Sequence, residues 1–408
     1  MTTSTTTATS TSTVLTCQLT FGPTDLYATD GFLSSQLAAD DFNGDGLSDL
    51  ALCDSWNSAV DVFLGNGNGN GTFGQEMTYP VVDGGSPISL DIADFNNDNH
   101  LDIVVMNDYT YSVGILFGNG NGTFGVMIIL PVVFSVVLSQ PLYFRCIATD
   151  LNNDGYIDIV FTKNNYPCSI AILLGFGNGS FATETIISIG SDGCELSFAI
   201  ADFNDDDNKD VAVAIDIDFY VAVLLGRGNG SFKTPMTFST GIYSFPSSID
   251  VNDFNNDGYL DIVVANQGNY NIGVFFGMGD GTFGTQITTM TEHTNIVTRI
   301  AVGDFNSDGK MDIAGVCGVE NTGLLSSIPT FVTVFVGYGN GNFGQQMIFP
   351  TEPDTLKYVI TNDFNGDGLL DLAITYQDGM NVGILLNTCP CCALEISSQA
   401  YLSTNDSP

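Results

Sequence analysis

A nine-residue acidic motif, D-x-N-x-D-x-x-x-D, occurs seven times in this 408-residue chain and constrains its fold more than any other feature. Successive copies begin 51 to 59 residues apart, a period typical of propeller blades and solenoids. A chain of this length would ordinarily form two or three domains, but regular repetition predicts one large unit. The copies are Asp41–Asp49, Asp94–Asp102, Asp150–Asp158, Asp202–Asp210, Asp253–Asp261, Asp304–Asp312 and Asp363–Asp371.

Short apolar runs surround every copy in the same order, as the second repeat illustrates. A run at Ile88–Ala93 precedes the motif, and runs at Ile103–Met106 and Val113–Phe117 follow it. Runs of about five residues rich in Val, Ile and Phe indicate strands rather than helices. Asn-Gly pairs then mark a hairpin turn that leads into a fourth strand. Each repeat is therefore predicted to be a four-stranded meander that buries its faces by packing on its neighbours.

The two ends of the repeat array complement each other. The last repeat stops after its third run, Gly383–Leu386, whereas Thr20–Gly22 supplies an orphan fourth strand ahead of the first motif. Joining them closes the ring and removes exposed strand edges. We therefore predict an all-β, seven-bladed propeller at residues 15–388, preceded by a Thr/Ser-rich linker or stalk at 1–14 and followed by a Cys-containing tail at 389–408.

The motifs are predicted to bind calcium, because each offers side-chain oxygens at positions 1, 3, 5 and 9 and a backbone carbonyl at position 7. Oxygen-only ligands favour calcium over zinc or copper, and magnesium prefers a more rigid octahedron. One copy alone would equally suit a solvated turn, but seven copies in register favour up to seven structural Ca²⁺ ions. The predicted ligands are Asp41, Asn43, Asp45, Leu47, Asp49; Asp94, Asn96, Asp98, His100, Asp102; Asp150, Asn152, Asp154, Tyr156, Asp158; Asp202, Asn204, Asp206, Asn208, Asp210; Asp253, Asn255, Asp257, Tyr259, Asp261; Asp304, Asn306, Asp308, Lys310, Asp312; and Asp363, Asn365, Asp367, Leu369, Asp371.

Position 6 of the motif is usually glycine, which suits a left-handed turn. Asn99 and Asp207 replace it in the second and fourth copies, so these loops are expected to be slightly weaker. The apolar residue at position 2, Phe in six copies and Leu151 in the third, is expected to be a core anchor.

These motifs and the Phe-Gly pairs resemble the FG-GAP repeats of the integrin α-subunit head, and related VCBS-type repeats of surface proteins and some fungal lectins. The resemblance covers roughly Leu15 to Asn387. It implies a propeller with calcium in hairpin loops and a ligand surface on one face, without specifying the ligand. Two repeats keep the Phe but lose the Gly, so their turns are expected to differ (Phe181 and Phe232), and no Gly-Ala-Pro segment is recognisable. The Phe-Gly pairs begin at Phe21, Phe73, Phe124, Phe283 and Phe343.

Charge limits the classes of partner. The chain has 46 acidic and 8 basic residues, a net charge of −38, which argues against nucleic acid and anionic membrane surfaces. No apolar run approaches the roughly 20 residues that span a bilayer, so no direct membrane insertion is expected. The N-terminal segment lacks the features of a signal peptide, so a fragment or a preceding anchor is expected. The stalk-like start favours an extracellular or cell-surface location.

Cysteines and sequons suggest two covalent features of a secreted protein. A disulfide between Cys17 and the cluster Cys389–Cys392 would staple the ring closure. Asn-Gly-Thr/Ser sequons recur in the turns after the third strands, where the turn itself explains them and where N-glycans would also be accepted. They lie at Asn70, Asn121, Asn178 and Asn229.

The recognition surface is predicted on the face opposite the calcium loops. Successive turns of a meander alternate between its ends, so the loops between the second and third strands share that face with the blade connections. These segments vary most between repeats, as recognition loops on a rigid scaffold do. Packing between blades is the alternative for any one aromatic there. The predicted ligand residues are Trp56, Tyr109, Tyr166, Tyr220, Tyr243 and Tyr270.

No catalytic constellation is recognisable, so the chain is predicted not to be an enzyme. Of the two histidines, His100 lies in a calcium motif and His293 in a blade connection, neither near a Ser or Cys nucleophile in the repeat pattern. The leading hypothesis is a calcium-stabilised extracellular module for cell adhesion or protein recognition. A propeller lectin is the alternative, and a hydrolase on the same scaffold is less favoured, a ranking that rests on fold-level analogy. The expected partner is an extracellular protein or glycan.

Overall fold

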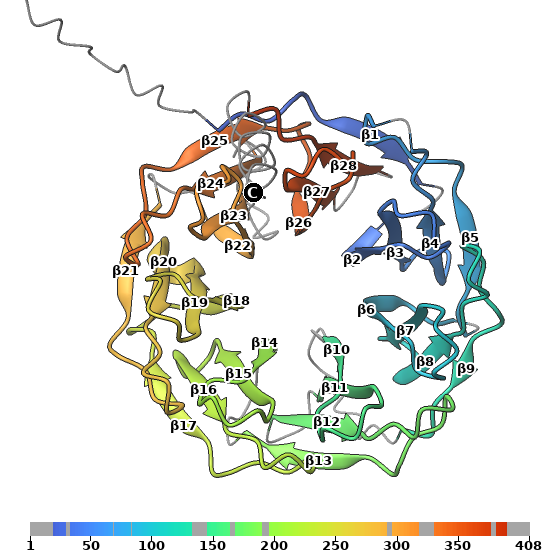
Figure 1. The fold of residues 1–408 in the computed structure, drawn as a ribbon, viewed down its shortest axis with the longest axis horizontal. Coiled ribbons are helices and arrows are strands. Elements are labelled where there is room, and N and C mark those ends of the chain that lie inside the picture. The colour runs from blue at the N-terminus through green and yellow to red at the C-terminus, as the bar shows by residue number, and fades with distance from the viewer. Residues whose placement is uncertain are drawn as a thin grey trace, which may run out of the picture.

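The protein forms a closed ring of seven four-stranded antiparallel sheets (Figure 1). The computed structural model describes residues 19–29, 33–67, 69–82, 84–132, 145–163, 168–189, 196–291, 296–317, 330–376 and 381–389. Among these residues the helical content is one 3-10 turn, η1 (Gln267–Asn269), and no helix is long and apolar enough to cross a membrane. The predicted all-β, seven-bladed propeller is confirmed.

The first four blades follow the chain in order from the centre of the ring outward. Blade 1 contains β2 (Leu33–Asp40), β3 (Asp49–Asp54), β4 (Ala59–Phe63) and β5 (Met77–Pro80). Blade 2 contains β6 (Pro87–Ala93), β7 (Asp102–Asn107), β8 (Ser112–Leu116) and β9 (Ile128–Ile129). Blade 3 contains β10 (Cys146–Thr149), β11 (Asp158–Lys163), β12 (Ser169–Leu173) and β13 (Thr185–Ser188). Blade 4 contains β14 (Leu196–Ala201), β15 (Asp210–Ile215), β16 (Tyr220–Leu224) and β17 (Met236–Ser239).

The remaining blades repeat this arrangement until the ring closes. Blade 5 contains β18 (Pro246–Asn252), β19 (Asp261–Asn266), β20 (Asn271–Phe275) and β21 (Ile287–Met290). Blade 6 contains β22 (Val297–Gly303), β23 (Asp312–Cys317), β24 (Phe331–Phe335) and β25 (Met347–Pro350). Blade 7 contains β26 (Leu356–Asn362), β27 (Asp371–Tyr376), β28 (Asn381–Leu385) and, as its outer strand, β1 (Asp25–Ala28).

The N-terminal strand completes the last blade, as the complementary ends of the sequence predict. Strand β1 pairs antiparallel with β28, with Asp25 opposite Ile384 and Ala28 opposite Asn381. Figure 1 shows this blue strand beside the red strands of blade 7. The amide of Gly22 also donates to the carbonyl of Leu386 at 2.8 Å. Closure therefore rests on a full strand pairing rather than on a loop contact.

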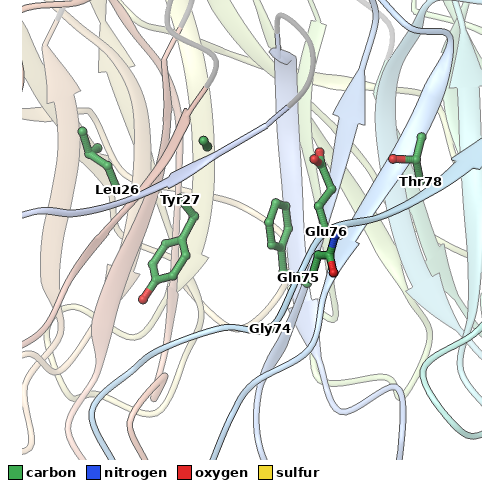
Figure 2. A pocket seen from close by; sticks show the side chains of 8 residues that line it. Leu26, Tyr27, Gly74, Gln75, Glu76 and Thr78 are labelled. Carbon is green, nitrogen blue, oxygen red and sulfur yellow. The ribbon is translucent and has the colours of Figure 1, made fainter.

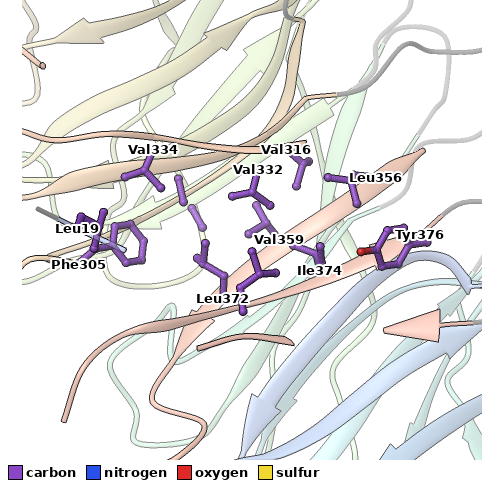
Figure 3. Packing of buried hydrophobic residues seen from close by; sticks show 13 residues of the cluster. Leu19, Phe305, Val316, Val332, Val334, Leu356, Val359, Leu372, Ile374 and Tyr376 are labelled. Carbon is purple, nitrogen blue, oxygen red and sulfur yellow. The ribbon is translucent and has the colours of Figure 1, made fainter. Parts of the chain in front are cut away.

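Seven apolar clusters fill the spaces between neighbouring blades. The second and third strands of each blade are buried on both faces, which explains their continuous Val, Ile and Ala runs. Figure 3 shows the cluster between blades 6 and 7, where Val332 and Val334 face Val359 and Ile374. Because every cluster draws on two blades, no blade is stable without its neighbours.

Phenylalanines at two conserved places in the repeat join adjacent blades. The motif position 2 residue is buried in all seven blades, which confirms its expected role as a core anchor. Phe42 of blade 1 meets Phe124 of blade 2 edge to face, with ring centroids 5.3 Å apart. The amide of Gly122 donates to the carbonyl of Phe42 at 3.1 Å, so backbone and rings lock the same junction.

Two expectations about the Phe-Gly segments need correction. The Phe does not begin the outer strand: Phe73 forms an isolated bridge with Gly65, and β5 starts only at Met77. The turns that lack the Gly do not differ either, because Phe181 and Phe232 form the same bridges. The residue after each Phe contributes only its backbone amide to a bond such as Ala182 N to Leu174 O, 2.8 Å, which any residue except proline provides.

Candidate metal loops and binding face

The first aspartate of each motif folds the loop around its own carboxylate. In blade 1, Asp41 Oδ1 accepts the amides of Gly44 and Asp45 at 2.7 and 3.1 Å, and its Oδ2 accepts the amide of Gly46 at 2.7 Å. The bond from the position 6 amide to this carboxylate recurs in all seven loops. Backbone amides thereby compensate a carboxylate that would otherwise repel its neighbours.

Motif positions 3 and 5 continue the same pattern along the loop. Asn43 Oδ1 accepts the amide of Asp45, and Asp45 Oδ1 accepts the amide of Leu47, each at 2.9 Å. Both bonds recur in every loop. The side chains at positions 1, 3 and 5 therefore hold the backbone of the loop in a tight curve.

Left-handed residues make this curvature possible. Asn99 and Asp207 at position 6 have φ of 64° each, like the glycines they replace. Position 4 is also left-handed, with Asn97 at 62° and Ser307 at 56°, a feature the sequence analysis missed. Gly44 and Gly366 at that position were an available signal.

The aspartate at position 9 is fully buried and joins two parts of its blade. Asp102 Oδ2 accepts the amide of Phe95 at 3.0 Å, and its Oδ1 accepts the amide of Gly118, in the turn after the third strand, at 2.8 Å. Burial raises the pKa of Asp102 to about 6 although these two amides lower it. In blades 6 and 7 burial raises the pKa of Asp312 and Asp371 to about 7.

The donor set of these loops fits calcium in chemical type. Carboxylate, amide and carbonyl oxygens are the ligands that calcium takes, and each carboxylate oxygen accepts more than one partner. In the described part of the chain no three His, Cys, Asp or Glu side chains converge as a metal cluster on their own. A cation would therefore depend also on the position 3 amide oxygen and the position 7 carbonyl.

Two loops carry a basic side chain beside the predicted ligands. Lys310 Nζ lies 3.1 Å from Asp308 Oδ2, and His100 Nδ1 lies 3.4 Å from Asp98 Oδ1. Both basic residues occupy position 7, where only the carbonyl was considered in the sequence. A bound cation would compete with them for the position 5 carboxylate.

The predicted ligand residues on the opposite face divide into exposed and half-buried ones. Trp56 and Tyr109 are 70% and 77% exposed on blades 1 and 2. Tyr220 instead packs partly against the cluster between blades 3 and 4. Tyr166 lies outside the described residues.

Tyr243 joins Phe219 and Phe245 in an aromatic cluster on blades 4 and 5, which we call the aromatic patch, and Tyr270 ends the adjoining loop of blade 5. Phe219 is its hub, with ring centroids 5.7 Å from Tyr243 and 5.0 Å from Phe245. Gly268 N donates to Ser244 O at 2.8 Å and so docks the two loops together. The patch consists of Phe219, Tyr243 and Phe245, and Ile217, Ile242 and Tyr270 are exposed apolar residues on the same two loops and the connection between them.

The aromatic patch and the adjoining Tyr270 are built on strained backbone. Phe219, Tyr243, Phe245 and Tyr270 have φ of 58°, 57°, 43° and 53°, a region that bulky residues rarely enter. Such strain persists only when surrounding contacts enforce it, and it concentrates at functional sites. Ile242 and Tyr243 nevertheless remain 78% and 67% exposed.

The calcium-loop face also exposes apolar side chains that the sequence analysis missed. Phe176, Met278 and Tyr338 are 56 to 58% exposed. All three follow the first glycine of the turn after a third strand, where Asn66, Asn119 and Arg227 stand in other blades. Comparing that position across repeats would have identified them.

The sequons and cysteines are only partly described. Asn121 Oδ1 accepts the hydroxyl of Thr123 at 2.6 Å, and the other three sequons form the same turn. This contact supports the turn as the origin of the sequence, and glycosylation stays a prediction. Cys389 is described and buried, but its predicted partner Cys17 and the neighbouring Cys391 and Cys392 lie outside the described residues, so the disulfide stays a prediction. Cys53, Cys146 and Cys317 are free buried thiols.

Sequence comparison identifies a repeat family. Residues 41–105, 150–213, 202–264 and 253–315 match the family model of the FG-GAP-like repeat. Together these stretches cover more than half of the chain. No curated protein sequence matches the chain.

Solved structures share the fold at low identity. BBS1N, in a complex with ARL6DN, has a TM-score of 0.60 at 11% identity, covering 90% of this chain and 96% of that one. An Agrocybe aegerita lectin solved for recognition of non-reducing terminal N-acetylglucosamine has a TM-score of 0.53 at 18% identity, covering 88% and 96%. Virginiamycin B lyase from Staphylococcus aureus has a TM-score of 0.58 at 10% identity, covering 90% and 99%.

Proposed function

This chain belongs to the FG-GAP-like repeat family, and from that premise we propose that it is a calcium-stabilised binding module that acts outside the cell in adhesion or protein recognition. The calcium ions would be held by motif positions 1, 3, 5, 7 and 9 and would fix the loops that join first and second strands. The ligand would bind on the opposite face.

The observation that carries this proposal is the aromatic patch. Its side chains stay exposed, and Tyr243 and Phe245 in the connection between blades 4 and 5 take left-handed backbone that no other non-glycine residue in the described blade connections takes. The left-handed Phe219 and Tyr270 correspond to Ser58 and Tyr111 in the same turn of blades 1 and 2. Tyrosine and phenylalanine are enriched in the cores of protein interfaces because they combine large contact area with few rotatable bonds. The patch therefore suits an apolar, partly aromatic protein surface.

Two solved propellers show what this fold accommodates, although they share only the fold with this chain. BBS1N was solved in a complex with ARL6DN, and the Agrocybe aegerita protein recognises N-acetylglucosamine. A carbohydrate ligand is accordingly the second candidate, because Trp56 and Tyr109 expose further aromatic rings on neighbouring blades. A catalytic role is the least favoured hypothesis for this chain, although one protein of the same fold is a lyase. The acidic side chains of the loops, which could otherwise serve in catalysis, already hold the loop backbone.

The test is a paired screen of the calcium-loaded protein. An array of secreted and cell-surface proteins and a glycan array are probed with wild type and with Tyr243→Asn, since Asn tolerates the left-handed backbone at this position. Loss of a central aromatic contact is expected to weaken a protein hit roughly tenfold or more. Tyr338→Asn, on the calcium-loop face, is the matched control and should leave the hit unchanged.

The pattern of hits separates the candidates. Protein hits that depend on Tyr243 support the proposal, whereas weak glycan hits that survive Tyr243→Asn favour lectin activity spread over several blades. Hits that depend equally on Tyr338 would not localise the recognition surface to the face opposite the calcium loops and would contradict the proposal.

A further inference from the structure

Two of the seven acidic loops place a glycine directly after the position 3 asparagine. The pairs are Asn43–Gly44 in blade 1 and Asn365–Gly366 in blade 7, whereas the other loops have Asn, Asp or Ser after that asparagine. An asparagine before glycine is especially open to attack on its carboxamide by the next backbone nitrogen, because glycine has no Cβ to hinder the approach. These two loops therefore carry a reactive pair that the other five lack.

The reaction open to such a pair is deamidation through a cyclic imide. The Gly44 nitrogen loses its proton to hydroxide and attacks Cγ of Asn43, so that a new N–Cγ bond forms and the bond from Cγ to Nδ2 breaks. Nδ2 takes a proton from water and leaves as ammonia. One water molecule then opens the imide at either of its two carbonyls, which gives aspartate or isoaspartate without any oxidant or reductant.

The folded loop protects both reacting groups. The amide of Gly44 donates to Asp41 Oδ1 at 2.7 Å, and the amide of Gly366 donates to Asp363 Oδ1 at 2.7 Å. An amide that donates to a carboxylate keeps its proton more firmly, and the bond fixes the direction of its nitrogen. Oδ1 of Asn43 also accepts the position 5 amide at 2.9 Å, which fixes the carboxamide. Deamidation therefore requires the loop to open.

Calcium binding controls how often such a loop opens. Gly44 and Gly366 are exposed to solvent, so water has access to both pairs and opening of the loop limits the reaction. A bound cation draws the aspartates of one loop together, whereas their carboxylates repel one another without it. At free calcium of about 100 times the dissociation constant, the population of open loops falls about 100-fold.

The two loops meet at the seam where the ring closes. Ser48 of the blade 1 loop donates its hydroxyl to the carbonyl of Asp363 in the blade 7 loop at 3.2 Å. On the same seam, the hydroxyl of Tyr27 in β1 donates to the carbonyl of Gly71 at 3.2 Å. A pocket of about 390 Å³ opens there, and Figure 2 shows Tyr27 and Glu76 in its lining. Water thus reaches the seam, and damage to either loop acts on the junction that the N-terminal strand closes.

We propose that Asn43 and Asn365 are paired deamidation sites, protected while calcium holds their loops and reactive when calcium is withdrawn. Isoaspartate at either position lengthens the main chain by one methylene group and removes the oxygen that accepts the position 5 amide. The closing seam then loses its ordered loops, so time spent in low calcium limits the lifetime of the ring. The calcium dependence rests on the function proposed above, whereas the glycine and its hydrogen bond do not.

The test is site-resolved mass spectrometry of the full chain from a bacterial host, which leaves the asparagines free of glycans. Samples age in mildly alkaline buffer made with heavy-oxygen water, with calcium or with EGTA. Peptide mapping then separates asparagine, aspartate and isoaspartate at each site, and the heavy oxygen excludes products formed during digestion. Deamidation at Asn43 and Asn365 is expected to be roughly tenfold or more faster in EGTA. Equal rates in the two buffers overturn the proposal.

Melting curves of the fresh samples separate this failure from that of the proposed function. A melting temperature that rises with calcium while the two rates stay equal contradicts only the deamidation inference. Equal melting temperatures together with equal rates contradict the calcium-stabilised module as well.

A second asparagine–glycine pair outside the acidic loops is the internal control. In Asn340–Gly341 the Gly341 amide donates to the carbonyl of Phe254 at 3.0 Å, in the turn after a third strand. This pair should deamidate at the same rate in calcium and in EGTA. An equal acceleration at Asn340 would mean general unfolding and would contradict opening of the loops.

Replacing the glycine tests the chemistry and its consequence. Gly44→Asn introduces the residue of blade 2, where Asn97 has φ of 62°, and a Cβ on Gly44 meets nothing within 4 Å. This variant should lose the Asn43 product while Asn365 reacts as in wild type, and an unchanged Asn43 rate contradicts the cyclic imide. Wild type aged in EGTA and returned to calcium should melt lower than the double variant with Gly366→Asn. Equal melting of the two contradicts the effect on the lifetime of the ring.

Discussion

Within each blade, the position 9 aspartate links the acidic loop to the turn after the third strand. Its two carboxylate oxygens accept amides from opposite sides, one from the acidic loop and one from the turn after the third strand. In blade 4 these bonds run from Phe203 N to Asp210 Oδ2 at 2.9 Å and from Gly226 N to Oδ1 at 2.6 Å. A fully buried acceptor pair of this kind connects two turns that no strand pairing joins.

Asp210→Asn is therefore expected to destabilise the protein even without metal. The Asn side chain has one oxygen, so one backbone amide would face an NH₂ group and stay unsatisfied. The expected loss is about 1–3 kcal/mol in the free energy of unfolding. Urea denaturation in EGTA measures it, with Asp280→Asn as the control. A loss that appears only in calcium would assign Asp210 to metal binding rather than to the amides.

At the residue scale the sequence predicted the left-handed position 6 and the identities of the oxygen donors, because both follow from the spacing of one motif. It could not predict that Asp102 and its counterparts serve two amides, because the second amide comes from a turn beyond two intervening strands.

Among the elements, the turn after each third strand makes the junction with the preceding blade. Phe124 in the blade 2 turn contacts both Phe42 and Tyr79 of blade 1, with ring centroids 5.3 Å away in each case. Edge-to-face pairs add stabilisation beyond the area they bury. The Phe-Gly segment is thus part of an interface rather than of a strand.

Phe124→Ala is expected to cost about 3–5 kcal/mol, the usual range for a buried Phe truncated to Ala. Phe176→Ala changes the same residue type in a neighbouring turn, but its side chain is 56% exposed. That control should change the free energy of unfolding by no more than about 0.5 kcal/mol. Chemical denaturation of both variants compares them directly, and equal losses would argue against the interblade junction.

Strand existence and order were predictable because apolar periodicity and turn residues recur seven times. The outer strands were placed too early, since β5 begins at Met77 and β9 has only two residues, Ile128 and Ile129. Half-exposed outer strands alternate weakly in polarity, so their first residues carry little signal. The aromatic patch was only partly predicted, because Phe219 joins Tyr243 through tertiary contacts that the sequence pattern does not encode.

At the scale of the whole molecule, the ring concentrates negative charge on one face. The seven acidic loops lie at corresponding ends of the blades, and their aspartates make up half of the 46 acidic residues of a chain with net charge −38. Backbone amides partly compensate the negative charge of the aspartates in each loop. Repulsion between carboxylates of the same loop and of different loops remains. The chain should therefore gain stability from any cation that binds only the folded loops.

Calcium removal is expected to lower the melting temperature of the entire ring in one transition, since each interblade cluster couples neighbouring loops. When the free calcium concentration is 100 times the dissociation constant of a site, that site stabilises the folded state by about 2.7 kcal/mol. Several such sites would raise the melting temperature by many degrees. Differential scanning calorimetry in calcium, in EGTA and in EGTA with excess magnesium measures the effect, with magnesium expected to restore little of it. Added sodium chloride at matched ionic strength controls for simple screening. Equal melting curves in calcium and EGTA would mean that the backbone amides alone hold the acidic loops.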